Sequence, residues 1–213
     1  MGKINQGILG GFSGKVGNVI GGNWKGIDYM RVKPASVANP KTEGQVDQRS
    51  KFSTALRFLQ PLNEFLKVGY KNYAVKMTQF NSAMSYTLKN AMTGAYPDFT
   101  IDYANALVSR GALTVVKNGE ASYSSNGAVD FAWTDNTGEG SAKATDKAML
   151  LIINNGKGEA IFTTAGNARS AEAQTLTIPD DYAGDQVECF ISFISVDGLS
   201  ISNSKYVGSV TLE

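Results

Sequence analysis

Ala128-Val129-Asp130-Phe131-Ala132-Trp133 is the stretch that decides the fold class of this 213-residue chain. Its large apolar side chains, Val129, Phe131 and Trp133, recur at every second position, which is the period of a β-strand with one buried face. The same alternation returns near the C-terminus, where it runs through Val187, Cys189, Ile191 and Phe193. Two such strands predict a sheet whose inner face belongs to a core.

Short strands separated by turn residues fill the sequence from residue 98 onward. The turn pairs that separate them are Asn118-Gly119, Asn126-Gly127, Thr137-Gly138, Asn155-Gly156, Ala183-Gly184 and Asp197-Gly198. Many short strands joined by such turns are typical of an antiparallel β-sandwich. We expect strands at residues 101–109, 113–117, 128–133, 148–154, 159–164, 174–178, 187–196 and 204–212.

Before this region, the apolar residues follow a helical period. Thr42 and Gln45 have the form of a capping box, and apolar residues follow at three- and four-residue spacing as far as Phe65. Pro61 is expected to kink or split this helix, because proline has no amide hydrogen and clashes with the preceding turn. Its polar face carries three basic residues, which are Arg49, Lys51 and Arg57.

A second helix is expected from about Asn72 to Met92, with Gly94 as its stop. The two helices predict a helical hairpin, and two helices do not close a core by themselves. This hairpin must therefore pack on the N-terminal segment, on the strands that follow or on a partner.

The first 33 residues hold nine glycines with apolar residues between them. A solvated linker would be glycine, serine and polar residues, so this segment is expected to lie against a surface. We expect strands at 16–20 and 24–32 around a turn at 21–23. A helix is the less favoured alternative, since each helical glycine costs about 1 kcal/mol relative to alanine. The residues expected to dock on a partner are Gly11, Phe12, Gly14, Val16, Gly17 and Trp24.

The composition argues against catalysis. The chain has no histidine and one cysteine, Cys189, so histidine-based catalytic sites and cysteine-cluster metal sites are excluded. Gly14-Lys15 lacks two parts of a phosphate loop: Leu9 stands where a glycine is needed five residues earlier, and Val16 stands where Ser or Thr is needed. The acidic loops at 135–140 and 179–185 have two interpretations, calcium binding and simple exposure to solvent. We prefer exposure to solvent. We therefore expect no enzyme, and no catalytic, cofactor or metal site.

Charge divides the chain into two halves. Residues 1–97 hold 13 Lys/Arg against 4 Asp/Glu, a net of +9, whereas residues 98–213 hold 7 against 15, a net of −8. We expect these halves to be two domains, the first a docking segment with the helical hairpin and the second the sandwich. Such asymmetry predicts an acidic partner for the first half, either nucleic acid or the acidic half of a neighbouring copy.

From Ala128 on, the sequence resembles an immunoglobulin-like sandwich of the fibronectin type III kind. Trp133 stands where the core tryptophan of that family lies. Leu176-Thr177-Ile178-Pro179, Tyr182 and Val187-Glu188-Cys189-Phe190 are similar to its late-strand corner. The resemblance implies an Ig-like sandwich in this part. With the glycine-rich β-hairpin segment and the helical hairpin expected before it, the predicted fold class is α+β.

Nearly the full length resembles a family of uncharacterised bacterial and phage-associated proteins, a domain of unknown function. The shared features are Gly10-Gly11-Phe12-Ser13-Gly14-Lys15-Val16-Gly17-Asn18, Trp24-Lys25-Gly26, Gln45 with Gln48-Arg49 and Lys51-Phe52, Val196-Asp197-Gly198, and Ser202-Asn203-Ser204 with Tyr206 and Gly208. This resemblance implies a fold and a context, and it carries no catalytic residues.

The preferred function is a non-enzymatic structural subunit of a virion or another large assembly, with a protein partner or further copies of itself. The alternative is a carbohydrate- or ligand-binding module that uses the sandwich loops. Tyr103, Tyr123 and Trp133 are considered as an aromatic platform for it, but the apolar alternation around Trp133 favours a core position for that residue. Nucleic-acid contact by the basic half is a lesser alternative. The sequence has no apolar run long enough to span a membrane and no secretory leader pattern, so we expect cytoplasmic synthesis.

Overall fold

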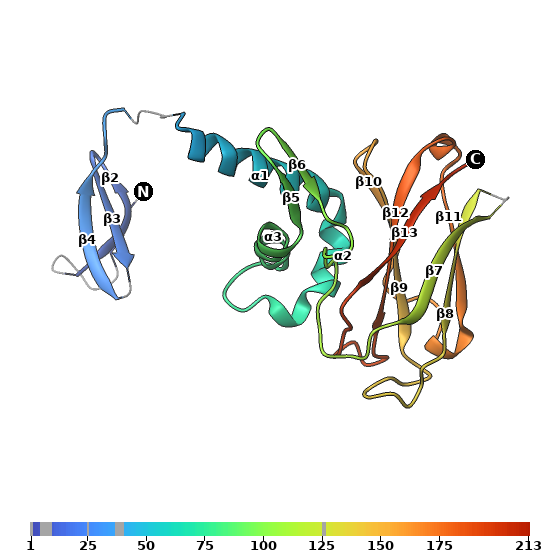
Figure 1. The fold of residues 1–213 in the computed structure, drawn as a ribbon. Helices are drawn as coiled ribbons and strands as arrows, with labels where there is room; N and C mark the ends of the chain where they lie inside the picture. Colours follow the sequence, from blue (N-terminus) through green and yellow to red (C-terminus); the bar gives the residue numbers. More distant parts are fainter. Residues whose placement is uncertain (1, 5–9, 25, 37–40, 125–126) are drawn as a thin grey trace. The chain divides into compact units, whose positions relative to one another are not determined.

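The computed structural model describes residues 2–4, 10–24, 26–36, 41–124 and 127–213. The chain divides into two compact units, Met1–Thr42 and Glu43–Glu213, which we call unit 1 and unit 2 (Figure 1). The expected boundary after residue 97 falls within unit 2, in the turn that joins strands β5 (Met92–Ala95) and β6 (Asp98–Ile101). The helices therefore belong with the second half of the chain.

Unit 1 is an antiparallel sheet in its described residues. The strands are β1 (Lys3–Ile4), β2 (Phe12–Val16), β3 (Val19–Trp24) and β4 (Ile27–Val32), in that order across the sheet. The expectation of extended structure is confirmed.

The position expected for the turn in unit 1 is wrong, because residues 21–23 lie inside β3. One turn lies where Val16 pairs with Val19, and it uses Gly17 at φ 57°. At the next turn Trp24 pairs with Ile27, and Gly26 has φ 89°. Glycine adopts such angles at little steric cost, so these two glycines suit the turns, whereas Gly14, Gly21 and Gly22 lie within strands.

Unit 2 begins with the helical hairpin. Helix α1 (Glu43–Leu59) gives way to a 3-10 turn (Gln60–Leu62) and then to α2 (Asn63–Gly69). The expected break at Pro61 is thus confirmed, since that residue lies in the 3-10 turn.

The second helix is shorter than expected at both ends. Helix α3 is Gln79–Asn90, and the Thr78 side chain caps it by accepting a hydrogen bond from the Asn81 amide at 3.2 Å. Residues Lys71–Tyr73 form a separate 3-10 turn. Met92 and Gly94 belong to β5, which pairs with β6 in a hairpin. The apolar spacing continued beyond the helix because this hairpin packs on the same core.

Two antiparallel sheets form the rest of unit 2. The four-stranded sheet has the order β10-β9-β12-β13 and the three-stranded sheet the order β11-β8-β7. Their bounds are β7 (Lys117–Ser124), β8 (Ala128–Thr134), β9 (Lys147–Asn154), β10 (Glu159–Thr163), β11 (Ala173–Thr177), β12 (Gln186–Ile194) and β13 (Lys205–Thr211).

Strands β8 to β13 lie where the sequence placed them, whereas the start of the sandwich differs. Asn118-Gly119, expected as a turn, lies inside β7, where the register shifts between Lys117 and Glu120. Asn118 takes φ 48° there, so the turn chemistry makes an irregularity within a strand. The strands expected at residues 101–109 and 113–117 are wrong, because residues 102–116 form no continuous strand and Leu113 makes an isolated bridge to Ser202.

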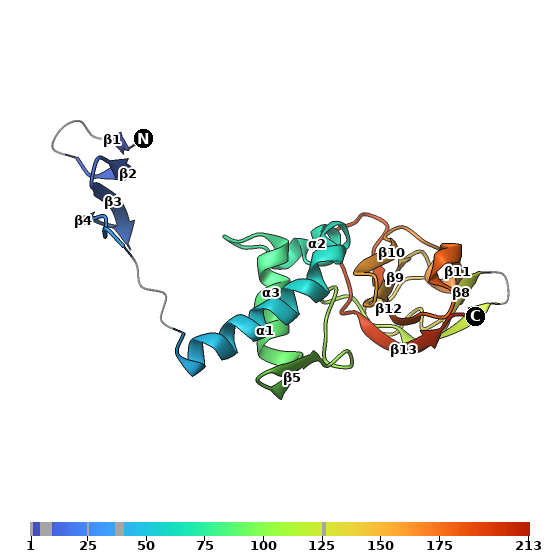
Figure 2. The same cartoon turned by 90° about the horizontal axis from the view of Figure 1, so that it is seen from above.

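Strands β9 and β12 are buried on both faces. One face shares a core with the three-stranded sheet, and the other shares a core with α1, α2 and α3 (Figure 2). In β9 the residues Ala148, Leu150 and Ile152 face the first core, while the intervening apolar residues face the second. Unit 2 therefore has three layers: helices, the four-stranded sheet and the three-stranded sheet.

The burial of Cys189 provides a test of this layering. Its side chain is fully buried in β12, and burial, together with the charge of Glu188, raises the pKa of the thiol to about 12. Because the thiolate is the reactive form, the native protein at pH 8 should react with a disulfide reagent more than about 100-fold slower than the unfolded chain. The reaction is followed by absorbance with and without guanidinium chloride, and equal rates would contradict the buried position.

Candidate functional site

The sheet of unit 1 carries a different set of apolar side chains on each face. Strand register aligns Val16, Val19 and Val32 in one row and Lys15, Ile20 and Arg31 in the next. Because alternate residues point to opposite faces, the sheet has two distinct surfaces. We define the first face as Phe12, Val16, Val19, Met30 and Val32, and the second face as Ile20, Trp24, Ile27 and Tyr29, with Lys15 and Arg31.

Two glycines in β3 make room for aromatic rings. A Cβ at Gly21 would overlap the backbone oxygen of Phe12 and lie 2.6 Å from its ring, and one at Gly22 would lie 2.9 Å from the Tyr29 hydroxyl. The rings thus lie over backbone that has no side chain, one on each face. This packing explains why the strand itself is rich in glycine.

Among the described residues of unit 1, no second layer covers either face of the sheet. Gly21 is the buried residue among those described there, and Val32 and Met30 are 74% and 71% exposed. The other exposed apolar side chains are Val16, Trp24, Ile27 and Tyr29. A sheet of this size normally needs an apolar face packed on another layer to be stable. The two faces are therefore the candidate docking surface.

The residues that the sequence suggested for docking do not form a single surface. Phe12 and Val16 lie on the first face and Trp24 on the second. Gly17 is a turn residue, Gly14 is a strand residue at φ 104°, and Gly11 lies against the Asp28 carboxylate.

Sequence reasoning missed the contribution of β4. Ile27, Tyr29, Met30 and Val32 are all exposed there, along the open edge of the sheet. The sequence contained this information. Apolar residues stand at both odd and even positions of the strand, and this pattern predicts two apolar faces rather than one.

The basic residues of α1 do not share one face of the helix. At 100° per residue, Arg49 and Lys51 lie about 160° apart around the axis. Lys51 pairs with Asp47 at 3.2 Å and lies 4.8 Å from the Phe99 ring centroid. Arg57 lines a separate cavity of 220 Å³ beside Tyr103. The three charges are thus dispersed and do not form a continuous basic surface.

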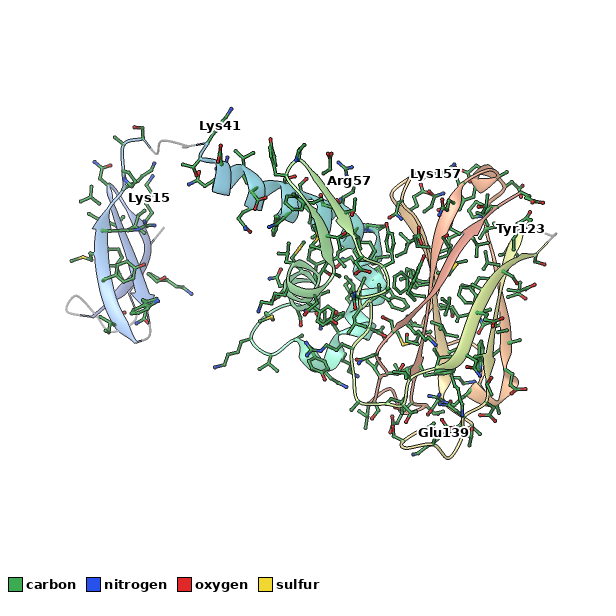
Figure 3. All side chains as sticks on the ribbon, in the orientation of Figure 1. Lys15, Lys41, Arg57, Tyr123, Glu139 and Lys157 are labelled. Atoms are coloured by element: carbon green, nitrogen blue, oxygen red, sulfur yellow. The ribbon has the colours of Figure 1, made fainter. Side chains whose placement is uncertain are left out.

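The aromatic platform considered as an alternative is not formed, and the core position preferred for Trp133 is confirmed. Trp133 is buried in the core between the two sheets, 5.7 Å from the Phe193 ring. Tyr103 packs in the helical core, stacked on Tyr206 at 5.8 Å. Tyr123 lies at the end of β7 far from Arg57 on α1 (Figure 3), and its hydroxyl donates to the Glu213 carbonyl at 2.5 Å. These rings belong to three different places.

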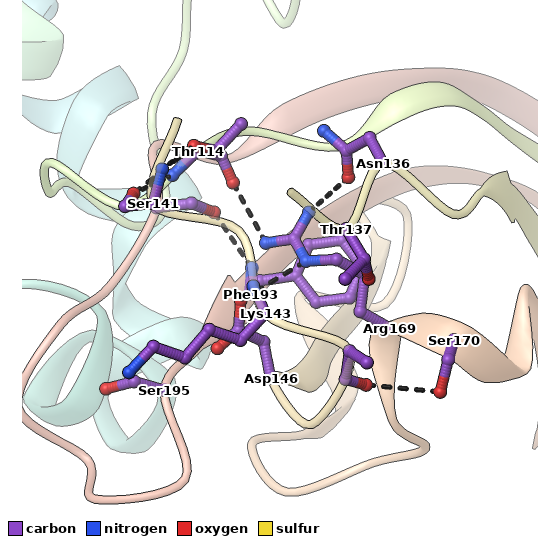
Figure 4. Close-up of polar contacts among 12 residues, drawn as sticks. Thr114, Asn136, Thr137, Ser141, Lys143, Asp146, Arg169, Ser170, Phe193 and Ser195 are labelled. Atoms are coloured by element: carbon purple, nitrogen blue, oxygen red, sulfur yellow. Dashed lines mark hydrogen bonds and ion pairs between the residues drawn. The ribbon is translucent and has the colours of Figure 1, made fainter. Parts of the chain in front are cut away.

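A buried arginine lies at one end of the sandwich (Figure 4). Arg169 is fully buried and donates to Asn136 Oδ1 at 2.6 Å and to the Thr114 carbonyl at 3.0 Å. Its Nε is 3.2 Å from Asp146, and its guanidinium lies 3.8 Å from the Phe193 ring centroid. Burial lowers the pKa of Arg169, and the Asp146 carboxylate opposes that shift.

The geometry of the cluster around Arg169 indicates a structural role. Asp146 is as buried as the arginine, and the Trp133 indole donates to the Arg169 carbonyl at 2.7 Å. The cluster therefore links three parts of the sandwich, which are strand β8, the loop before β9 and the segment before β11. All of these contacts are made within the protein.

The acidic loops use their carboxylates internally. Asp135 accepts from the Thr137 amide at 2.9 Å, and Asp181 pairs with Lys157 at 2.7 Å. In the described ranges no group of three or more acidic or cysteine side chains is placed to hold a metal ion. Nor does the described chain include a helix long and apolar enough to cross a bilayer.

Comparisons with known proteins place the chain in a sequence family. The model of a family described as "Family of unknown function (DUF6266)" matches residues 11–208. No curated protein matches. Among solved structures, the fibronectin type III domain of the human collagen alpha-1(XX) chain is similar at 12% identity and a TM-score of 0.36, covering 48% of this chain and 89% of that one.

The Asp146–Arg169 pair gives a prediction for stability. Asp146→Asn leaves a buried guanidinium without its counter-charge, which is expected to lower the free energy of unfolding by about 3–5 kcal/mol. The change in the free energy of unfolding is measured by denaturing the full chain with guanidinium chloride. As a control, Asp181→Asn breaks an exposed pair and should change stability far less. Equal effects of the two substitutions would contradict the structural role.

The packing over Gly21 gives a prediction for unit 1. Gly21→Ala forces a methyl group into the backbone and ring of Phe12, and overpacking of this kind costs about 1–3 kcal/mol. Amide hydrogen exchange in β3 and β4 should accelerate, with unit 2 unchanged. Gly44→Ala is the matched control, because open space surrounds that glycine in α1. Unchanged exchange in Gly21→Ala would disprove the ring-over-glycine packing.

Proposed function

The chain belongs to the DUF6266 family, whose function is unknown, and from its own geometry we propose that it is a non-enzymatic structural protein of a larger assembly. Unit 1 docks on a protein partner through its sheet, which has apolar side chains on both faces. The observation that carries the proposal is a four-stranded sheet with exposed apolar side chains on both faces. Exposed contiguous apolar surface of this kind marks interaction sites in soluble proteins.

The partner we propose is unit 2 of another copy. Residues 1–42 carry six Lys/Arg against one Asp, a net of +5, and residues 43–213 carry 14 Lys/Arg against 18 Asp/Glu, a net of −4. Opposite charges steer two surfaces together and disfavour contact between like units. The second face joins its apolar residues to Lys15 and Arg31, so it is the face that we assign to this contact.

A head-to-tail contact of this kind suits a repeating assembly. One surface on each copy binds a different surface on the next, and such heterologous contacts close into rings or extend into filaments. A virion or another large bacterial assembly is the setting that we propose for it. Synthesis in the cytoplasm fits that setting.

For unit 2 we propose a fibronectin type III-like sandwich as the rigid body of the assembly. Seven strands in two antiparallel sheets, four in one and three in the other, support this assignment. The absence of histidine from the sequence and the internal pairing of Arg169 support a role without catalysis.

Variants on the two faces of β4 test the docking. Full-length protein should self-associate in sedimentation velocity at low salt and dissociate as salt rises, because the contact is between opposite charges. Ile27→Asp puts an acid on the second face and should weaken association about tenfold or more. Val32→Asp, on the first face, should weaken it less.

The matched control is Val32→Asp, which adds the same charge at a similarly exposed apolar residue on the opposite face of the sheet. Amide exchange of β3 checks that each variant keeps unit 1 folded. A full-length chain that stays monomeric at every concentration and salt level rejects the proposal, and an equal loss in Val32→Asp rejects the assignment to the second face.

A further inference from the structure

A cavity of 420 Å³ lies in the helical part of unit 2. The residues that line it belong to unit 2 and lie between positions 73 and 110. One helical stripe of α3 supplies Ser82, Ser85, Tyr86 and Lys89, at spacings of three and four residues. Tyr73 comes from the 3-10 turn before α3, and Arg110 comes from the segment after β6. The volume is within the range of small-molecule sites, about 300–1,000 Å³.

Two tyrosine rings hold the guanidinium of Arg110. It lies 4.3 Å from the Tyr73 ring centroid and 5.5 Å from that of Tyr86. Its backbone amide donates to the Gly69 carbonyl at 2.9 Å, which anchors the residue to the end of α2. Among the described residues the guanidinium donates no hydrogen bond, so its N–H groups are left for a ligand, and these are the groups that bind oxyanions.

No carboxylate among the described residues pairs with Arg110, unlike Arg169 in the core of the sandwich. The surrounding sequence is also one-sided in charge. Residues 65–97 contain no Asp or Glu, and they contain Lys67, Lys71, Lys76 and Lys89. Only Lys67 of these pairs with an acid in the structure, with Glu64 at 2.6 Å. The cavity therefore has two cations on its wall and no opposing carboxylate in its lining.

We propose that this cavity binds an oxyanion, the carboxylate or phosphate of a small hydroxylated molecule. Arg110 binds the anion through its N–H edge and Lys89 adds a second positive charge. The Ser82 and Ser85 hydroxyls are hydrogen-bond partners for the hydroxyl groups of the ligand, and Tyr73 and Tyr86 keep the guanidinium in place. The proposal does not depend on docking by unit 1.

Carboxylate and phosphate share this chemistry, and titrations separate them. Isotope-labelled full-length protein is titrated with galacturonate, glucose 6-phosphate and inorganic phosphate, with galactose and glucose as neutral counterparts. The NMR signals of the Arg110 side chain and of the α3 amides should shift saturably with an acidic sugar. The acidic sugar should bind at least tenfold more tightly than its neutral counterpart. Tighter binding of one acidic sugar identifies the anion.

Substitutions assign the binding to the cavity. Arg110→Met should weaken binding at least tenfold, and Lys89→Met should weaken it less. Lys67→Met removes a lysine outside the cavity lining and should leave the affinity unchanged. Thermal melting checks folding, and Lys89→Met carries the test if Arg110→Met does not fold. The proposal is overturned if no anion binds, if neutral sugars bind as tightly, or if binding survives both cavity substitutions.

Discussion

Burial of the β9–β12 pair on both faces is the constraint on which unit 2 depends. Seven consecutive residues of β9, Ala148–Asn154, are buried, and so is most of β12. A sheet buried on both faces needs a covering layer on each side, because exposed apolar area costs roughly 25 cal/mol per Å². The three-stranded sheet supplies one layer and the helical hairpin supplies the other. The helices are thus part of the sheet's core rather than a separate domain.

Unit 1 shows the opposite arrangement. Its sheet has apolar side chains on both faces, as β9 and β12 do, yet no other described part of the unit covers them. The glycines of β3 let the Phe12 and Tyr29 rings lie over the backbone, and this gives the small sheet some internal packing. The remaining apolar surface and the net positive charge together support a docking role.

Two arginines of unit 2 illustrate how surroundings decide the role of a side chain. Arg169 is enclosed by an acid, an amide, a carbonyl and a ring, so its hydrogen-bonding capacity is used within the protein. Arg110 has rings near its guanidinium and no ion-pair partner among the described residues. A buried and paired guanidinium stabilises the fold, whereas one that faces a cavity without an acid is suited to a ligand.

The sequence by itself determined the local structure of this protein. Alternation at Val129, Phe131 and Trp133, helical spacing after Thr42 and the break at Pro61 all depend on neighbours along the chain, and all agree with the structure. The tertiary structure alone decided that the helices cover the outer face of β9 and β12 and that Asn118-Gly119 lies within a strand. It also decided that Arg110 meets Tyr73 and Tyr86. Those contacts join residues far apart in the chain, and their partners are selected by packing in three dimensions, which no local period records.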